Sequence, residues 1–551
     1  MKIILQTTFF VLIIISSLAA QAHQQVSYKT DVQTNDQTDS HLEIKPLQPT
    51  CDESDNVDLK QNDIFDLTDP ETIFLHHWAN FLHIKTKPAT IKNESAFFFK
   101  KCDVNDQDLL ELERHLRKQK YIRDAVVKVD ENNKIIVETF DNWSLMPTID
   151  FGRKGGKNKF AIGLKDRNLL GLGIDTEIEY YTNDQRTGYK FDTEFPLYLG
   201  NNITASIGFT SNDDGSSQVI KVDKKFVSFD TPYAFSVGIN NFNQIDTQYQ
   251  NGVELARFNH DKTGSMLHWS WLFSDNQVST IRYGLGYSSQ KNTFSPVSSD
   301  NSNLAGFVPY DREQNYPFVS VEYLQKDYRK LKNFNVINQI EDFNLGWHGA
   351  IKLGHDFSND LISPNWVVES TISKGFQTSD NSYAFVAASI DGEDYQKNTR
   401  YVVQLWSEYF HKFNDNWGGY LKNTNIISQN QYLDQPIALG GESGVRGYPL
   451  QYQHGDRSVQ FTAEARYYPH INIYKFFELG AAAFIDTGKT FGTSPFTNVD
   501  ASLMTSIGFG ARFYTALSSE AQVIHLDVIK PLSSDLNVNN VEFRITTKHS
   551  F

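Results

Sequence analysis

The sequence predicts a transmembrane β-barrel of antiparallel strands, preceded by a small α+β domain. From Leu145 to the end, segments of about ten residues alternate between apolar and polar or small side chains, as barrel strands do. Beyond residue 22, no stretch approaches the ~18 consecutive apolar residues of a membrane-spanning helix. Aromatic residues make up 13% of the chain, although its mean hydropathy of -0.45 is typical of soluble proteins. Alternating barrel strands account for both values.

The N-terminus predicts export. Residues 1–22 contain Lys2, an apolar run and a small-residue cleavage site ending at Ala22, which together are typical of a secretory signal peptide. A transmembrane helix is the weaker alternative, because the run is too short to span a bilayer comfortably. Residues 23–59 are polar and are expected to be a flexible lead-in. In an oxidising compartment Cys51 and Cys102 are a candidate disulfide, and two free thiols are the alternative.

The first half of residues 60–143 is expected to hold a helix. Asp69-Pro70-Glu71 is typical of a helix start, with an aspartate as N-cap and a proline in the first turn. The helix would carry an apolar stripe, consisting of Ile73, Phe74, Trp78, Phe81 and Leu82. Three histidines lie on or near it, namely His76, His77 and His83. They match no H-E-x-x-H pattern and have no further ligand at a telling spacing, so we expect no metal site.

Residues 86–141 read as helix, helix, strand, strand. Leu109, Leu112 and Leu116 mark one face of a helix that is capped near Asn105 or Asp106. Two alternating segments around Val127 and Val137 follow, joined by a turn. This order resembles a POTRA domain, the periplasmic module attached to outer-membrane assembly barrels. That family usually carries glycine where this chain has Cys102.

Residues 144–551 are expected to form the barrel. Four C-terminal segments show the alternation best, at residues 459–466, 479–486, 507–513 and 541–546. The apolar face would be the core of a soluble sandwich or the lipid-facing surface of a membrane barrel, and periodicity alone does not choose. The signal peptide, the aromatic content and the long run without a helix favour the barrel, whose closure removes sheet edges. The terminal Phe551 resembles the signal that outer-membrane proteins present to their assembly machinery.

A glycine-rich loop, GGESGVRGYP at residues 440–449, is the candidate functional site. The barrel prediction places this loop at the outer end, between two late strands. Two alternating segments follow the loop, at residues 457–467 and 477–488. By alternation, Glu464 lies on the lumen face of the first segment, and Asp486 lies on the lumen face of the second, beside small residues. A buried aspartate needs a cation, so we expect the loop to fold inward and deliver Arg446 to Asp486, with Glu464 as a second partner.

The two motifs together indicate a family. Val445-Arg446-Gly447-Tyr448, followed by Phe484, Asp486 and Gly488 in F-I-D-T-G, resembles the paired signature of the BamA/TamA-like superfamily, also called the bacterial surface antigen family, which includes the two-partner secretion transporters. The resemblance implies that Arg446 contacts the barrel wall at Asp486, without a catalytic role. It also implies 16 strands. The alternation along the chain shows nearer twenty candidate segments, but we expect 16 strands.

Charge and motifs narrow the function. A net charge of -15 argues against binding of nucleic acid, which needs a basic surface. No G-x-S-x-G, P-loop, H-E-x-x-H or C-x-x-C motif is present, so we expect neither an enzyme nor a cofactor. The basic cluster at 153–157 is expected to be a solvated outer turn, with contact to lipopolysaccharide phosphates as the functional alternative.

The resemblance implies a protein of the bacterial outer membrane, in contact with its lipid and lipopolysaccharide, with the N-terminal domain in the periplasm. There it would assemble or translocate polypeptides, and the POTRA-like domain would receive β-rich clients by strand addition. A channel or structural barrel that keeps the fold without a client is the alternative.

Overall fold

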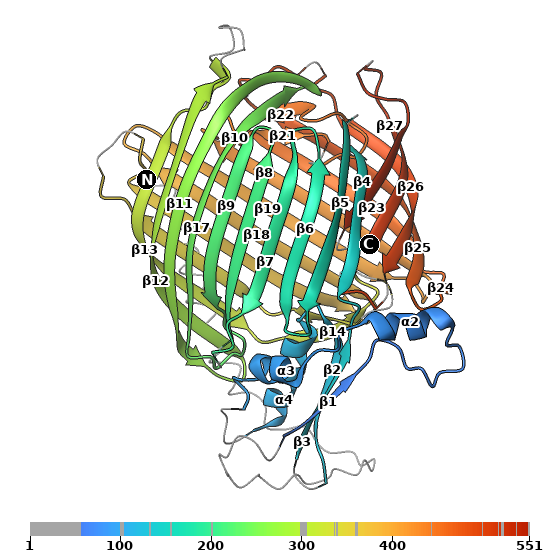
Figure 1. The fold of residues 1–551 in the computed structure, drawn as a ribbon. Helices are drawn as coiled ribbons and strands as arrows, with labels where there is room; N and C mark the ends of the chain where they lie inside the picture. Colours follow the sequence, from blue (N-terminus) through green and yellow to red (C-terminus); the bar gives the residue numbers. More distant parts are fainter. Residues whose placement is uncertain are drawn as a thin grey trace, which may run out of the picture.

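The computed structural model describes most of the chain beyond residue 56 (Figure 1). The described ranges are residues 57–99, 104–131, 134–154, 157–199, 202–297, 306–335, 337, 340–358, 362–441, 444–498, 500–515, 517–519, 523–535 and 537–548. The expected signal peptide, Cys51, Cys102 and Phe551 lie outside them. Within the described ranges, no helix has the length and apolar character needed to cross a membrane.

The N-terminal part is a three-stranded sheet with two helices. The strand order is β1 (Val57–Asn62), β3 (Ile135–Asp141), β2 (Ile122–Val129), with β1 parallel and β2 antiparallel to β3. Helices α3 (Pro88–Glu94) and α4 (Asp106–Arg117) contribute Ile91, Leu112 and Leu116 to one core with Val127 and Val137. Strand β1 therefore begins inside the segment expected to be a flexible lead-in.

Helix α4 begins where its sequence predicts. Asn105 is the N-cap, and its side chain accepts a hydrogen bond from Asp108 N at 3.1 Å. The Asp108 carboxylate accepts one from Asn105 N at 3.0 Å, which completes a capping box. Such side-chain partners satisfy backbone N–H groups near the start of a helix, where the regular helical acceptors are missing.

The predicted start of the first helix is wrong by several residues. Helix α2 spans Phe74–Leu82, with Ile73 as its N-cap. Asp69 instead closes a turn, in which its side chain accepts a hydrogen bond from Glu71 N at 2.9 Å. An aspartate followed by proline satisfies an Asx turn as well as a helix cap, and here the turn is formed.

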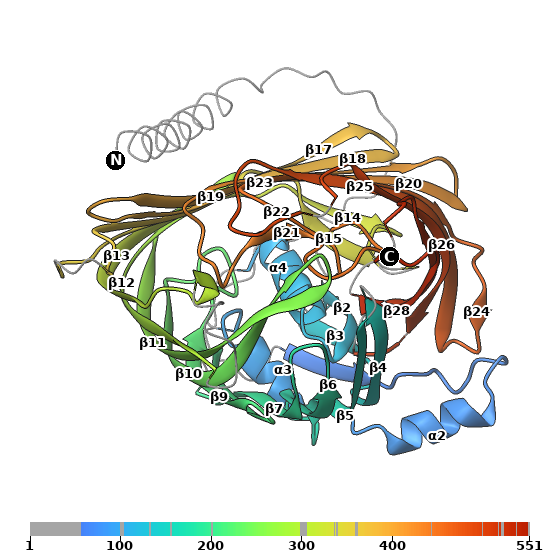
Figure 2. The same cartoon turned by 90° about the horizontal axis from the view of Figure 1, so that it is seen from above.

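The rest of the chain forms a closed antiparallel barrel whose strands follow one another in sequence order, with β28 beside β4 (Figures 1 and 2). The strands that run between its two ends are β4 (Leu145–Lys154), β5 (Lys157–Leu169), β6 (Ile174–Thr182), β7 (Thr187–Pro196), β8 (Ile203–Asn212), β9 (Gly215–Lys224), β10 (Tyr233–Gln250), β11 (Val253–Asp275), β12 (Ser279–Pro296), β13 (Arg312–Gln325), β16 (His348–His355), β17 (Trp366–Ser379), β18 (Ser382–Asp394), β19 (Thr399–Lys412), β20 (Trp417–Gln429), β23 (Arg457–Tyr467), β25 (Phe477–Phe491), β26 (Met504–Thr515), β27 (Val523–Pro531) and β28 (Glu542–Lys548). A two-residue strand, β24 (Asn472–Ile473), pairs with the start of β25.

The expected count of 16 strands is wrong, because the described residues form twenty that run between the two ends. The alternation along the sequence, which shows nearer twenty segments, predicted the strand number better than the family resemblance. The motifs that suggested 16 lie on the last few strands only, and nothing in them depends on how many strands precede them. A wider barrel encloses a larger lumen, since diameter grows with strand number.

Alternation along the late strands places polar residues in the lumen and apolar ones outside, as the sequence predicts. Along β25 every second residue is buried, including Phe484 and Asp486, and the residues between them are more accessible. Outward side chains such as Ile485, Phe509 and Phe543 are exposed. These exposed apolar residues form the surface expected to face lipid.

The N-terminal domain lies at one end of the barrel, called here the near end, below the strands in Figure 1 and seen through the ring in Figure 2. Its contacts are with the turns of several barrel hairpins. Thr90 Oγ1 donates a hydrogen bond to Gly171 O at 2.7 Å, and Asn202 Nδ2 donates one to Asn93 O at 3.1 Å. These contacts fix the domain to the barrel rim.

A hairpin between β13 and β16 connects this domain to the lumen wall. Its strands are β14 (Tyr328–Lys332) and β15 (Ile340–Asn344). The Arg117 guanidinium of α4 donates to Asp342, with Nη2 at 3.0 Å and Nε at 3.2 Å from Oδ2. On the other side, Phe334 packs with Leu331 and with Phe410 of the wall. The hairpin therefore contacts both the domain and the barrel.

Candidate functional site

The loop between β20 and β23 lies at the far end of the barrel, opposite the N-terminal domain (Figure 1). Its two ends pair as strands β21 (Ile437–Leu439) and β22 (Gln453–Gly455). Between them the backbone takes positive φ at four glycines, which are Gly440, Gly441, Gly444 and Gly447. At Gly447 a Cβ atom would lie 2.8 Å from Pro531 Cγ, so only glycine allows the loop to approach β27 this closely.

Arg446 is bound to Asp486 by two hydrogen bonds. Its Nε donates to Asp486 Oδ2 at 2.5 Å, and its Nη2 donates to Oδ1 at 2.8 Å. This is the bidentate geometry that makes arginine–carboxylate pairs both strong and directional. The Asp486 side chain is 1% exposed and that of Arg446 is 7% exposed, so water screens the pair little.

A second carboxylate shares the arginine. Glu464 Oε1 accepts a hydrogen bond from Arg446 Nη2 at 3.1 Å. Its other oxygen, Oε2, accepts one from Arg466 Nε at 3.2 Å. Thr462 Oγ1 donates to Asp486 Oδ1 at 2.8 Å. Two arginines and two carboxylates therefore form one buried network on the lumen faces of β23 and β25, and their formal charges balance.

The register of the wall strands brings the network together. Thr462 on β23 lies opposite Asp486 on β25, and Glu464 lies opposite Phe484. The Phe484 ring lies flat under the arginine, with Arg446 Cζ 3.4 Å from the ring centroid. A ring face carries partial negative charge, so it attracts the guanidinium while it excludes water.

The residues beside Arg446 also contact the wall. Val445 and Tyr448 belong to an apolar cluster with Leu439, Tyr452 and Met504. The Tyr448 hydroxyl donates to Thr505 O at 3.1 Å and accepts from Thr505 N at 3.0 Å. A Cβ on the wall at Gly488 would lie 2.9 Å from Val445 Cγ2. The loop therefore sits on the wall through packing as well as charge.

The structure thus brings together all the expected loop and wall residues, which are Val445, Arg446, Gly447, Tyr448, Glu464, Phe484, Asp486 and Gly488. Sequence reasoning missed Thr462 and Arg466, although both lie on the lumen face of an alternating segment that also carries Glu464. It missed a second buried pair as well, in which Arg512 Nη1 donates to Asp527 Oδ1 at 2.6 Å. Polar or charged residues on a lumen face were the available signal for all of them.

The network continues to the near-end hairpin. Arg466 Nη1 donates to Phe334 O at 3.0 Å, and the Tyr468 hydroxyl donates to Asn333 O at 3.3 Å. Contacts therefore run from Arg117 of α4, through the hairpin, to Arg466, Glu464 and the loop arginine. No feature of the sequence indicated this hairpin.

The other residues singled out in the sequence lie outside the Arg446 network. His76 Nε2 donates to Tyr474 O at 2.8 Å, and His83 Nε2 donates to Asp141 Oδ2 at 2.9 Å. Among the described residues, no three His, Cys, Asp or Glu side chains are grouped as metal ligands would be. Of the basic cluster, Lys154 ends β4 and Lys157 begins β5, and the two residues pair at the far end of the barrel.

Comparison with known proteins gives a likeness of fold. No family model matches the chain, and no curated protein matches it. BamA from Haemophilus ducreyi lacking POTRA domains 1–3 aligns with 90% of this chain and 84% of its own, at 10% identity and a TM-score of 0.38. CdiB from Escherichia coli aligns over 89% and 76%, at 12% identity and a TM-score of 0.45. CdiB from Acinetobacter baumannii aligns over 84% and 72%, at 12% identity and a TM-score of 0.43. A likeness at this level assigns no function.

Proposed function

We propose that this chain is an outer-membrane factor of the BamA/TamA-like superfamily that assembles or translocates polypeptides. The observation that carries the proposal is the bidentate contact of Arg446 with Asp486, made by a loop folded onto the lumen wall. It joins the two motifs that resemble the superfamily signature. The pair holds the loop and has no catalytic role.

The joint between the first and last strands is where a client would gain access. The ring closes where β28 lies beside β4, the last and the first strand of the barrel. An opened joint presents unpaired N–H and C=O groups, to which a client strand can add.

The N-terminal domain would deliver the client from the periplasm. Its sheet has β1 and β2 as edge strands, and an edge strand can accept an extended polypeptide. The fixed contacts of the domain with the barrel turns keep these edges at the near end. The far-end loops would lie at the cell surface, beside lipopolysaccharide.

A channel is the second candidate, favoured by a cavity of ≈ 640 Å³ lined by residues of β9 to β13, β16 and β17. Charged side chains of both signs line it, including Arg282, Glu322, Lys352 and Glu369. Such a lining suits water and ions.

Reconstitution distinguishes the two functions. Vesicles of phosphatidylcholine and phosphatidylglycerol would carry the full chain, and a urea-unfolded eight-stranded barrel protein would be added as the probe client. We expect the chain to raise the rate of client folding at least several-fold over empty vesicles. The Arg446→Ala variant should lose most of this gain, and Arg457→Ala, at an exposed arginine of β23, should keep it. Ion conductance without any effect on the client would overturn the proposal in favour of the channel.

A further inference from the structure

Helix α2 exposes its apolar face, whereas the helices of soluble domains bury theirs. Its large apolar side chains point away from the protein, with exposed fractions of 77% for Phe74, 56% for Trp78, 83% for Phe81 and 44% for Leu82. At 100° per residue these four positions share one face of the helix. The buried side carries His76 and Ala79, which are 1% and 0% exposed.

Polar contacts fix this orientation. His76 Nε2 donates to Tyr474 O at 2.8 Å, while its Nδ1 accepts from Ile73 N at 3.2 Å. Asn80 Nδ2 donates to Phe65 O at 2.8 Å, and Asn80 Oδ1 accepts from Phe65 N at 3.1 Å. Rotating the helix to bury its apolar face would break the three hydrogen bonds to Tyr474 and Phe65, so the exposure is built into the fold.

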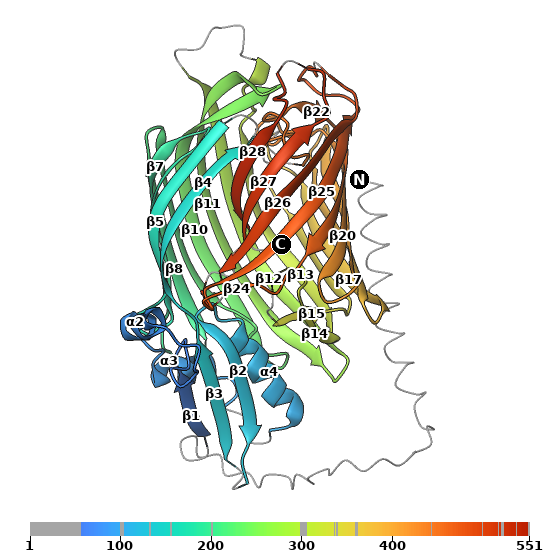
Figure 3. The same ribbon diagram turned by 90° about the vertical axis from the view of Figure 1, so that its right-hand side faces the viewer.

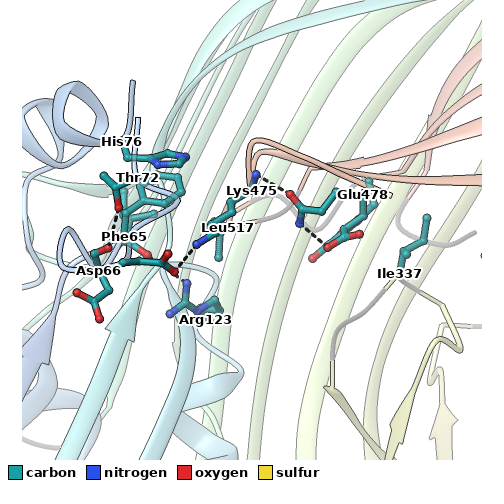
Figure 4. A pocket seen from close by; sticks show the side chains of 13 residues that line it. Phe65, Asp66, Thr72, His76, Arg123, Ile337, Lys475, Glu478 and Leu517 are labelled. Atoms are coloured by element: carbon teal, nitrogen blue, oxygen red, sulfur yellow. Dashed lines mark hydrogen bonds and ion pairs between the residues drawn. The ribbon is translucent and has the colours of Figure 1, made fainter. Parts of the chain in front are cut away.

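The helix lies outside the barrel ring at the level of the near-end rim (Figures 2 and 3). Figure 4 shows its inner side, where His76 and Phe65 line a cavity of ≈ 330 Å³ together with Lys475 and Glu478 of the rim. The Lys475 ammonium also pairs with Asp69, in the turn before α2. The inner side of α2 therefore faces the protein, and only its outer side is left without a partner among the described residues.

The apolar face of α2 continues the outer surface of the barrel. Beside its contact at Tyr474, the rim exposes Ile471, Tyr474 and Phe477, at 49%, 64% and 39%. Aromatic residues at such a rim are typical of the zone where a barrel leaves the bilayer. The helix Phe74–Leu82 contains no Asp, Glu, Lys or Arg, so its outer face carries no charge to keep it in water.

We propose that α2 is an interfacial helix, with Phe74, Trp78 and Phe81 inserted among the lipid headgroups and upper acyl chains of the leaflet next to the N-terminal domain. Short helices with an aromatic face bind membranes in this way, in the plane of the interface. The occupant is lipid because the face continues an apolar barrel surface that itself meets lipid. This anchor adds to the contacts that hold the domain at the rim and is independent of the assembly role.

Depth-dependent quenching tests the proposal on the full chain. In a background with Cys51→Ser and Cys102→Ser, a Phe81→Cys variant would carry an environment-sensitive fluorophore. The protein would be reconstituted in phosphatidylcholine–phosphatidylglycerol vesicles with lipids bearing a shallow or a deep nitroxide, and iodide would be present on both sides. The matched control is Val126→Cys, at an apolar side chain of β2 that is 37% exposed.

We expect the shallow nitroxide to quench position 81 several-fold more than position 126, and iodide to quench it several-fold less. Equal behaviour at the two positions would overturn the proposal. Protection from iodide without quenching by either lipid would also overturn it, because a second copy of the chain would then cover the face. Phe74→Ser with Trp78→Ser should restore iodide quenching at position 81 and leave the heat-modifiability of the barrel unchanged, since these side chains are mostly exposed. If iodide access does not change in this variant, lipid insertion through these residues is excluded.

Discussion

At the scale of single residues, alternation and charge were enough to pair Arg446 with Asp486. Both the lumen face of Asp486 and the need of a buried carboxylate for a cation follow from the sequence. The roles of Thr462 and Arg466 do not, because they depend on which residues face each other across β23 and β25. That register is set by the length of the intervening near-end turn, which the motifs do not encode.

The backbone conformation and close packing of Gly447 lead to a prediction for a single substitution. Its φ of +89° and the 2.8 Å approach to Pro531 mean that Gly447→Ala strains the loop, at a cost of about 1–3 kcal/mol. We expect faster protease cleavage between β20 and β23 and a lower midpoint of chemical unfolding. Gly349→Ala is the control, since a Cβ there meets only Thr371 O at 3.9 Å. Equal effects of the two substitutions would show that the loop is not held against β27.

At the scale of elements, strands β2 and β3 of the N-terminal domain and the strands of the late barrel could be predicted from periodicity, and α4 from its cap. The position of α2 could not. The sequence shows its apolar stripe, but a stripe indicates only that one face of the helix differs from the other. Which face turns inward depends on the partners of His76 and Asn80, which come from the distant Tyr474 and from Phe65.

The β14–β15 hairpin gives a second prediction. The pair between Arg117 and Asp342 is largely buried, at 11% and 16% side-chain exposure. Removing the guanidinium in Arg117→Ala loses charge-assisted hydrogen bonds worth about 1.5–3 kcal/mol. We expect amide exchange in residues 328–344 to rise by at least about tenfold, because 1.4 kcal/mol corresponds to a factor of ten in an equilibrium. Lys128→Ala, at an exposed site of β2, should leave exchange there unchanged. An unaffected hairpin in Arg117→Ala would mean that the domain does not support it.

The far-end loop gives a prediction for pH. Burial lowers the pKa of His454, which lies in β22 beyond the membrane-spanning strands, to about 4. The unfolded loop binds a proton below the ordinary pKa of about 6.5 and the folded loop does not, so loop stability is complete at pH 7 and falls as the pH drops towards 4. At pH 5 the loss is about 2 kcal/mol. Protease cleavage of the loop should therefore accelerate from pH 7 to pH 5 in the wild type, and not in His454→Gln. Identical pH profiles would contradict this role of His454.

At the scale of the whole molecule, the sequence predicted a closed barrel with a small domain before it, and the structure has this architecture. The strand number could not be predicted, because alternation identifies each strand only from its own residues. A barrel can close with many different numbers of strands. A ring of twenty strands leaves more lumen to fill than one of 16. In the described part of the chain, the Arg446 loop enters from the far end, and the β14–β15 hairpin packs on the wall from the near end.

We propose that the Arg446–Asp486 contact holds the loop inside the barrel and stabilises the whole molecule. The most direct test is a double-mutant cycle of Arg446→Ala and Asp486→Ala, read by heat-modifiability and chemical unfolding in detergent. Each single change leaves a buried charge without its partner and should cost about 3–5 kcal/mol, and the double variant should lose scarcely more than either. Arg457→Ala is the control, because its side chain is 64% exposed. If both single variants unfold like this control, and protease cuts their loops no faster than in the wild type, the contact does not hold the loop.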